Sequence, residues 1–372
     1  MEIKLTIVIT SFNRHSFLLR IVKFLISYKL PINILILDSS EKELENDQLK
    51  NITKKTNISF KRFPSNTPLA EKIFRGLKYV NTEYGVLCAE DDFLFPNSVL
   101  KCVEFLEDNQ NYSSAHGLYF NHTNYEESKL SGFNLFPLYG GKAISNEKET
   151  SLQRINHYFF SGKVHHYPFY AVHKSEVLKN IWEKTYLYAN EWQLNEYFPT
   201  YLSFIFGKMK VLPIIYSSRE PNYFNWVTID KSSSLLSRGS ILKASNELGK
   251  WLSKNDNILL EDSITIFIDY FNIKKKNLIE STIKSKIIRE KLEKSYLTKL
   301  KNIYLFRLIV INPKKLIKKL LKTILVFLRI RKSYIMRLST NSENYYELKK
   351  LQSTVLFNKV ITSEIMKSRS KY

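Results

Sequence analysis

The feature that most constrains the fold is an alternation of short apolar runs with amphipathic segments between Leu5 and Leu106. Four runs are predicted as strands: Leu5–Ile9, Ile32–Leu37, the shorter candidate Ile58–Arg62, and Tyr84–Cys88. Three segments with apolar residues at helical spacing are predicted as helices: Phe17–Tyr28, Leu69–Val80 and Pro96–Leu106. Continuous apolar strands that alternate with helices are typical of a mostly parallel sheet covered by helices. The predicted fold class is therefore α/β.

The remainder of the chain has a less regular pattern. Residues 121–180 show weak periodicity, so we predict long loops and short strands there. Two further elements are predicted, the helix Leu194–Phe206 and the strand Val211–Tyr216. Beyond them the sequence becomes Ser- and Lys-rich and helical in character. We therefore predict a first domain over residues 1–230 and a helical, basic C-terminal region over residues 231–372.

Cysteine content and hydropathy predict the compartment. Cys88 and Cys102 are the only cysteines, too few for a disulfide framework, which favours a reducing environment. The apolar run Leu5–Ile9 is short and lacks a small-residue cleavage site, so it predicts a buried strand and not a signal peptide. No stretch reaches the ~18 uninterrupted apolar residues of a membrane span. We expect a cytoplasmic protein.

Acidic side chains follow two of the predicted strands. Asp38 ends one, and Glu90, Asp91 and Asp92 follow another. Ligands of such sheets bind at the carboxyl ends of the strands. Adjacent carboxylates repel each other, and a divalent cation, Mg²⁺ or Mn²⁺, would offset that repulsion because hard cations prefer carboxylate oxygens. The alternative is a solvated acidic turn.

Four motifs in order along the chain resemble those of family-2 glycosyltransferases with the GT-A fold. They are the opening strand and loop Thr6–Arg14, the strand and acidic residue Ile34–Ser40, the DxD-type segment Glu83–Phe93, and the helix from Asn195–Glu196 to Gly207. The similarity covers roughly residues 4–220. The form Ala-Glu-Asp-Asp-Phe also resembles a bacterial subgroup of these enzymes. The resemblance implies that the first domain is catalytic and uses a nucleoside-diphosphate sugar.

The resemblance also implies roles for individual residues. Those that would line the nucleotide pocket or contact base and ribose are Thr10, Phe12, Arg14, Asp38, Glu90 and Asp91. Asp92, with Glu90, would ligate a cation that bridges the diphosphate and neutralises charge on the leaving group.

An inverting transferase needs a carboxylate that takes the proton of the acceptor hydroxyl. Counting back 11 residues from Gly207, as in the family's helix, leads to Glu196, and Glu191 is the second candidate. Both are alternatively solvated glutamates near a helix N-terminus, where negative charge is favoured. Arg219 is a candidate for forking onto phosphate oxygens, with pairing to Glu220 as the alternative. Lys72 is a further phosphate candidate.

The excess of positive charge is concentrated near the C-terminus. The net charge is +22, and Lys299–Arg337 contains 12 basic and no acidic residues. Residues 313–325 place lysines on one face of a predicted helix and Leu and Ile on the other. Such a helix within 303–337 suits an anionic membrane surface, so we expect peripheral association with the inner face of the cell membrane. Packing of the apolar face on the catalytic domain is the alternative. No base-reading motif supports nucleic-acid binding.

Together these features predict a metal-dependent, inverting glycosyltransferase that modifies a glycan or lipid-linked acceptor in bacterial surface-polysaccharide biosynthesis. A nucleotidyl- or phosphotransferase is a rival, but with 10 glycines the chain has no phosphate-cradling P-loop. A non-catalytic, membrane-associated binding module on a transferase-like fold is the other rival, and the intact acidic triplet argues against it.

Overall fold

The computed structural model describes residues 3–45, 47, 53–54, 57–125, 132–137, 144–160, 168–189, 191, 194–219, 236–277 and 280. The predicted basic helix within 303–337 lies outside these residues. The chain divides into two compact units, residues 1–271 with 341–372 and residues 272–340. Every strand of the sheet lies in the first unit.

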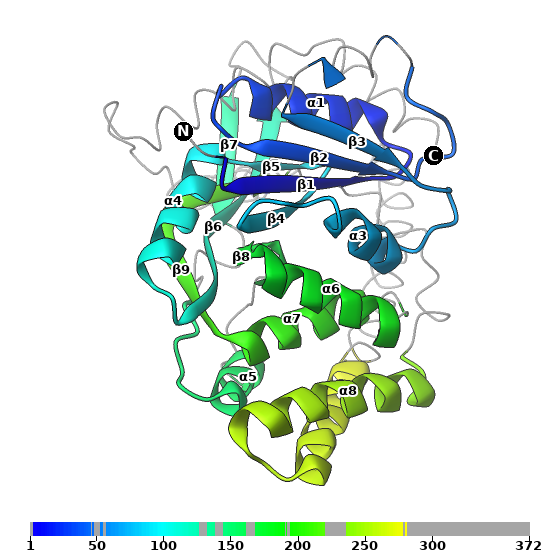
Figure 1. Ribbon diagram of the computed structural model, residues 1–372, viewed down its shortest axis with the longest axis vertical. Helices are drawn as coiled ribbons and strands as arrows, with labels where there is room; N and C mark the ends of the chain where they lie inside the picture. The colour runs from blue at the N-terminus through cyan, green and yellow to red at the C-terminus, as the bar shows by residue number, and fades with distance from the viewer. Residues whose placement is uncertain are drawn as a thin grey trace, which may run out of the picture. The chain divides into compact units, whose positions relative to one another are not determined.

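The described residues form one nine-stranded sheet with the order β3-β2-β1-β4-β8-β6-β9-β5, in which β7 pairs with β6 (Figure 1). The strands are β1 (Leu5–Ser11), β2 (Asn33–Asp38), β3 (Ile58–Arg62), β4 (Tyr84–Ala89), β5 (Asp92–Leu94), β6 (Tyr112–Tyr125), β7 (Gly132–Pro137), β8 (Val172–Lys174) and β9 (Lys208–Arg219). The four strands predicted in the first 90 residues are all present.

The first half of the sheet is parallel and the second half is mixed. β3, β2, β1 and β4 pair in parallel. β8 is antiparallel to both β4 and β6, β5 is antiparallel to β9, and β6 and β9 are parallel. The α/β class with helices over the sheet is confirmed, and the parallel pairing that the sequence predicted belongs to its N-terminal half.

Helices cover both faces of the sheet (Figure 1). The helices are α1 (His15–Ile26), α3 (Leu69–Leu77), α4 (Pro96–Asp108), α5 (Ser151–Phe160), α6 (Ser175–Tyr188), α7 (Leu194–Phe206) and α8 (Arg238–Asp256), with the short 3-10 helix η2 (Pro168–Tyr170). A further helix spans residues 260–277. None of the described helices is long and apolar enough to cross a membrane.

The prediction of long loops and short strands for residues 121–180 is wrong in two places, where α5 and the start of α6 form. In α6 the buried side chains Leu178, Ile181, Trp182 and Thr185 recur at helical spacing. The apolar side of this helix is broadened by aromatic residues, and this weakened the periodic signal in the sequence. β6 is also longer than the short strands expected, because it runs beside β9 along most of its length.

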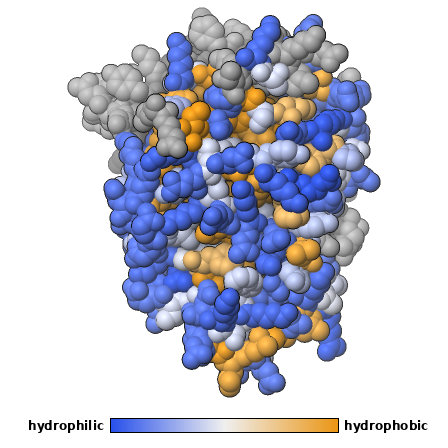
Figure 2. Space-filling view, viewed as in Figure 1, coloured by the Kyte–Doolittle hydropathy of each residue, from blue (hydrophilic) through white to orange (hydrophobic). Residues whose placement is uncertain are grey.

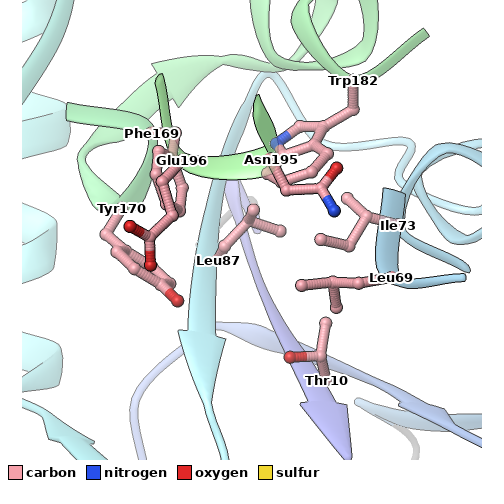
Figure 3. Close-up of a pocket in the computed structure, with 9 residues that line it drawn as sticks. All are labelled: Thr10, Leu69, Ile73, Leu87, Phe169, Tyr170, Trp182, Asn195 and Glu196. Carbon is pink, nitrogen blue, oxygen red and sulfur yellow. The ribbon is translucent and has the colours of Figure 1, made fainter. Parts of the chain in front are cut away.

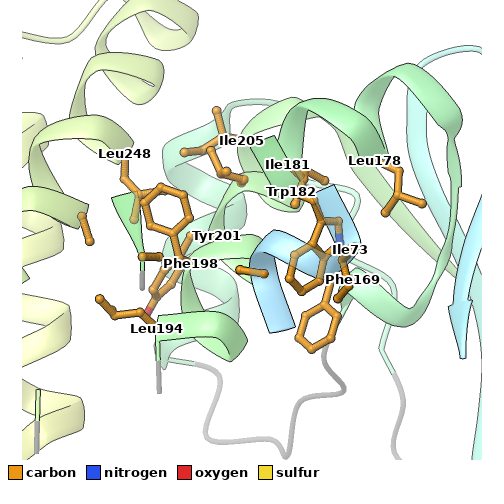
Figure 4. Packing of buried hydrophobic residues seen from close by; sticks show 14 of the residues in the cluster. Ile73, Phe169, Leu178, Ile181, Trp182, Leu194, Phe198, Tyr201, Ile205 and Leu248 are labelled. Carbon is orange, nitrogen blue, oxygen red and sulfur yellow. The ribbon is translucent and has the colours of Figure 1, made fainter. Parts of the chain in front are cut away.

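Two hydrophobic clusters lie on opposite faces of the sheet, as the alternation along β1 requires. Ile7 and Ile9 face the cluster that includes α1 and α4. Val8 faces the second cluster, which contains residues of α3, α6, α7 and α8. Figure 4 shows part of this second cluster, in which Trp182 and Phe198 are fully buried. The surface in Figure 2 is mainly hydrophilic, with smaller hydrophobic areas between the polar side chains.

Gly76 allows α3 to lie directly on β2. A Cβ atom added there would be 2.2 Å from Cδ1 of Leu37, a fully buried side chain next to Asp38. One turn earlier on α3, Lys72 points to the loops that follow β1 and β2. The close approach at Gly76 therefore sets the height of Lys72 above the carboxyl ends of these strands.

We expect Gly76→Ala to lower the free energy of unfolding by about 1–3 kcal/mol, because the added methyl overpacks the contact between α3 and β2. Gly239→Ala is the matched control in α8, since nothing lies within 4 Å of its added Cβ. It should leave the free energy of unfolding unchanged or raise it by up to about 1 kcal/mol. Urea unfolding measures both, and equal losses in the two variants would contradict the close approach.

Candidate active site

The strand register brings the predicted functional residues to one edge of the sheet. Ser11 of β1 is opposite Asp38 of β2, and Thr10 of β1 is opposite Ala89 of β4. Because the three strands are parallel, their carboxyl ends meet there. Asp38, the loop after β1 and the acidic triplet Glu90–Asp92 therefore share an edge, as the sequence predicted.

Asp38 is fully buried and holds neighbouring polar groups in place. Its Oδ1 accepts hydrogen bonds from the backbone N (3.2 Å) and Oγ (2.5 Å) of Ser40, and its Oδ2 lies 2.7 Å from Nη1 of Arg62 and 3.3 Å from Nε2 of His15. Burial alone would raise the pKa of Asp38, but the hydrogen bonds from His15 and Ser40 bring it below its ordinary value. A carboxylate has about four acceptor positions, and these contacts use them.

The loop after β1 is fastened to the loop after β2. Asn13 adopts a φ of 55°, a left-handed conformation that Asn tolerates. Its backbone N donates to Oγ of Ser40, and its Oδ1 accepts from the backbone N of Glu41, both at 2.8 Å. Phe12, next to this turn, is 45% exposed. An exposed aromatic side chain at the sheet edge fits its predicted place in a nucleotide pocket.

Lys72 lies beneath these loops and is only 3% exposed. Its Nζ donates to the backbone oxygen of Ser11 and to Oγ of Ser39, both at 2.8 Å. Burial lowers the pKa of Lys72, while the charges of Glu90 and Asp38 oppose that shift. Lys72 therefore joins the ends of β1 and β2 in this structure and does not face an open phosphate site.

The acidic triplet is compensated by two arginines. Nη1 of Arg14 lies 2.9 Å from Oδ2 of Asp91 and 3.5 Å from Oε1 of Glu90. Arg219 reaches Asp92 with two parallel hydrogen bonds, from Nε to Oδ1 and from Nη2 to Oδ2, each 2.7 Å long. Neither alternative weighed for Arg219 foresaw this pair, because β9 brings Arg219 opposite Asp92 of β5.

Burial and charge determine the electrostatics of the triplet. Burial, together with the neighbouring Asp91, raises the pKa of Glu90 to about 8 despite the opposing charges of Arg14 and Lys72. Burial also raises the pKa of Asp92, and Arg219 opposes that shift. The pKa of Arg219 rises because it faces Asp92. The two arginines therefore supply part of the positive charge that the sequence assigned to a metal ion.

Carboxylate oxygens are suitable ligands for Mg²⁺ or Mn²⁺, so the donor chemistry of Glu90 and Asp92 fits a cation. Both oxygens of Asp92 are hydrogen-bonded to Arg219, so a cation at Asp92 competes with the guanidinium. Among the described residues, no group of three or more His, Cys, Asp or Glu has the arrangement of a metal site. A bound diphosphate would have to provide the remaining oxygen ligands.

A pocket next to this edge contains the predicted base (Figure 3). Its lining residues come from β1, β4, α3, η2, α6 and α7: Thr10, Leu69, Ile73, Leu87, Phe169, Tyr170, Trp182, Asn195 and Glu196. Burial raises the pKa of Tyr170. The charge of Arg219 opposes this rise, and the charges of Asp92 and Glu196 add to it. Glu196 thus shares a pocket with Thr10, which pairs with Ala89, the residue before the acidic triplet.

Glu191, the second candidate base, has a different environment. Its Oε1 accepts from Oγ of Ser240 at 2.5 Å, and its Oε2 accepts from the backbone N of Ser237 at 3.2 Å. Ser237 is the N-cap of α8. Glu191 therefore stabilises the N-terminus of a helix, where negative charge is favoured.

Sequence reasoning missed His15, Arg62 and Tyr170 as members of the site. The signal for Arg62 was its place as the last residue of a predicted strand beside the strand that ends in Asp38. His15 directly follows the Thr6–Arg14 motif. Tyr170 lies in a region without periodicity, and nothing in the sequence indicated that η2 would reach the pocket.

Comparison with known proteins finds one family that resembles the N-terminal part of the chain. The model of Glycosyl transferase family 2 matches residues 6–182, which run from β1 into the middle of α6 and include Thr10, Asp38, Lys72 and the acidic triplet. Glu196 and Arg219 lie beyond the matched segment. No curated protein sequence matches the chain significantly.

Solved structures with a similar arrangement include those of S. aureus TarS. The crystal structure of its residues 1–349 is 11% identical, with a TM-score of 0.48 over 72% of this chain and 70% of that one. The complex of the same segment with UDP-GlcNAc is 12% identical, with a TM-score of 0.49 over 73% and 72%. The longer TarS structure is 11% identical, with a TM-score of 0.47 over 73% of this chain and 43% of that one. The family match over residues 6–182, slightly less than half of the chain, lies on a helix-covered sheet with acidic strand ends and supports a family-2-like glycosyltransferase.

Proposed function

We propose that the protein transfers a sugar, with inversion, from a nucleoside-diphosphate donor to a hydroxyl group of a glycan or lipid-linked acceptor. The observation that carries this proposal is the pocket shared by Thr10 and Glu196 at the sheet edge, beside the acidic triplet. The edge with the acidic triplet and its arginines suits the donor diphosphate. The pocket offers the carboxylate of Glu196 to the reacting hydroxyl.

Arg14 and Arg219 would bind the diphosphate. Their side chains are 28% and 41% exposed, so both reach solvent while they compensate the triplet. The fork of Arg219 onto the two oxygens of Asp92 is the geometry that a guanidinium also uses on phosphate oxygens. Lys72 would act indirectly, by holding the loops after β1 and β2 in place. Asp38 would similarly orient Arg62 and His15, because its own acceptor positions are used.

Glu196 would act as the general base. The acceptor oxygen forms a bond to the anomeric carbon of the donor sugar, and its proton passes to the Glu196 carboxylate. The bond between the anomeric carbon and the phosphate oxygen breaks, and the nucleoside diphosphate leaves with the electron pair. Attack from the face opposite the leaving group inverts the configuration at that carbon.

Asp92 and Glu90 would hold a Mg²⁺ or Mn²⁺ ion together with the donor diphosphate. When bound, such an ion neutralises negative charge on the departing diphosphate. The protein's part in this role is to keep two carboxylates, Glu90 after β4 and Asp92 at the start of β5, with Asp92 hydrogen-bonded to Arg219. In the donor complex Arg219 would turn from Asp92 to the phosphate oxygens.

The resemblance of Ala89–Phe93 to a bacterial subgroup supports an acceptor in surface-polysaccharide biosynthesis. Contact between the basic segment 303–337 and an anionic membrane surface would bring the enzyme to a lipid-linked acceptor. This proposal rests on the sequence of that segment, in which lysines and apolar residues occupy opposite faces of a predicted helix.

The first prediction for this mechanism separates the two candidate bases. We expect Glu196→Gln to lower the transfer rate by about 10²- to 10⁴-fold, the usual contribution of a general base, with the donor dissociation constant unchanged. Glu191→Gln should retain transfer and lose about 0.5–1.5 kcal/mol of stability, because it weakens the contacts with Ser237 and Ser240. Single-turnover assays and calorimetry measure both variants, and the opposite pattern would assign the base to Glu191.

The second prediction concerns the metal. Chelation with EDTA and the substitution Asp92→Asn should each lower donor turnover by roughly 100-fold, and added Mn²⁺ or Mg²⁺ should restore only the chelated wild type. Asp108→Asn, an exposed change at the end of α4, is the control and should behave as wild type. Undiminished turnover in EDTA would refute the metal dependence. Arg14 and Arg219 would then neutralise the charge of the diphosphate.

A further inference from the structure

Two buried polar atoms in the wall of the pocket have no hydrogen-bond partner among the described residues. They are Nε1 of Trp182 and Oδ1 of Asn195. Trp182 is 1% exposed and Asn195 is 7% exposed, so water does not replace the missing partners freely. Buried polar atoms are normally paired, and an unpaired one in a ligand pocket points to a group that the ligand supplies.

The rest of this part of the pocket is apolar. Leu69 and Ile73 of α3, Leu87 of β4 and Phe169 of η2 line it. In Figure 3 the amide nitrogen of Asn195 lies on the side of Ile73, and its oxygen lies on the side of Trp182. The cavity has a volume of about 50 Å³. That space takes a substituent of a few atoms and not a whole sugar.

The two polar atoms are complementary in kind. Oδ1 of Asn195 accepts a hydrogen bond, and Nε1 of Trp182 donates one. A substituent that satisfies both and also fills apolar walls must carry a donor, an acceptor and a hydrocarbon part. An N-acyl group has all three, in its N–H, its carbonyl oxygen and its methyl. A hydroxyl group could pair with both atoms but would leave the apolar walls without contact, and a deoxy position would leave both polar atoms unpaired.

The position of the pocket limits which carbon of the donor sugar can carry the recognised substituent. Glu196 lines the same pocket, and its proposed partner is the hydroxyl that attacks the anomeric carbon. The carbon bonded to the anomeric carbon is C2, so a substituent on C2 lies next to the reacting centre. A substituent at C4 or C6 would be farther from Glu196.

We propose that the donor is a nucleotide-linked 2-acylamino sugar, of the N-acetylhexosamine class, and that Asn195 and Trp182 recognise its acylamino group. Asn195 accepts the amide N–H, Trp182 donates to the carbonyl oxygen, and the methyl packs among Leu69, Ile73 and Leu87. This assignment rests on the proposed function, because it takes Glu196 as the base beside the anomeric carbon. It makes Asn195 and Trp182 specificity-determining residues.

The test compares matched donors on the full-length protein. The nucleotide is identified first, by calorimetry with UDP, GDP, TDP and CDP. On that nucleotide, dissociation constants are then measured for glucose against N-acetylglucosamine and for galactose against N-acetylgalactosamine. We expect at least one N-acetyl donor to bind about tenfold or more tightly than its hexose partner, since the hexose leaves buried polar groups and apolar walls imperfectly matched.

Two variants test whether Trp182 and Asn195 cause the preference for N-acetyl donors. Trp182→Phe removes the indole N–H and Asn195→Leu removes the amide, so each should weaken binding of the N-acetyl donor about tenfold and weaken hexose binding clearly less, which reduces the preference. Trp251→Phe is the matched control, since its Nε1 donates to Oε1 of Glu247 in α8 at 3.0 Å, and it should keep the wild-type preference. Equal weakening of both donors by Trp182→Phe and Asn195→Leu would assign these residues to packing alone and overturn the proposal.

A measurement on the wild type guards against variants that fail to fold. In saturation-transfer NMR the acetyl methyl of the bound donor should receive the strongest saturation of all sugar protons, because it is the part enclosed by apolar side chains. Tighter binding of the hexose donors, with catalysis intact, would refute the acylamino pocket and leave the proposed function standing. If the folded protein binds no nucleotide or nucleotide sugar of the panel, the proposed function itself is wrong and this inference falls with it.

Discussion

The compensation of three desolvated carboxylates is the interaction on which the site depends. Glu90, Asp91 and Asp92 follow β4 directly, and two of them are almost fully buried. Desolvation penalises their charged forms, so the fold must bring positive charge to them. Arg14 comes from the loop after β1, and Arg219 comes from the end of β9. These ion pairs connect the loop after β1 and the end of β9 with the segment that follows β4.

A second set of buried polar contacts holds the loops of the same edge. Asp38 accepts hydrogen bonds from two neighbouring elements, and Lys72 joins the backbone of β1 to the loop after β2. Both groups are buried, so each would destabilise the fold if its partners were lost. The consequence for function is rigidity, because a pocket built on fastened loops keeps its geometry when the donor enters. Asp38 and Lys72, which the sequence suggested as nucleotide-binding residues, therefore hold the loops of the protein in place in this structure.

Much of the fold followed from local patterns. The strand β3 and the helix α7 have the predicted bounds, and β1, β2, β4, α1, α3 and α4 differ only at their ends. Buried parallel strands and the amphipathic helices beside them carry strong periodic signals, which explains that agreement. The region 121–180 carried a weak signal, and α5 and α6 were missed there. The acidic edge was also predictable, because residues that directly follow parallel strands must meet at one side of the sheet.

By itself, the sequence determined the α/β alternation, the acidic strand ends and the choice of Glu196 and Glu191 as candidate bases. The tertiary structure decided how they are used. The partner of Asp92 is 127 residues away in the chain, and the contacts of Glu191 with Ser240 depend on where α8 lies. The unpaired atoms of Trp182 and Asn195 belong to one pocket only because both α6 and α7 line it. Local sequence sets which backbone conformation a segment prefers, whereas the pairing of distant side chains depends on packing across the whole sheet.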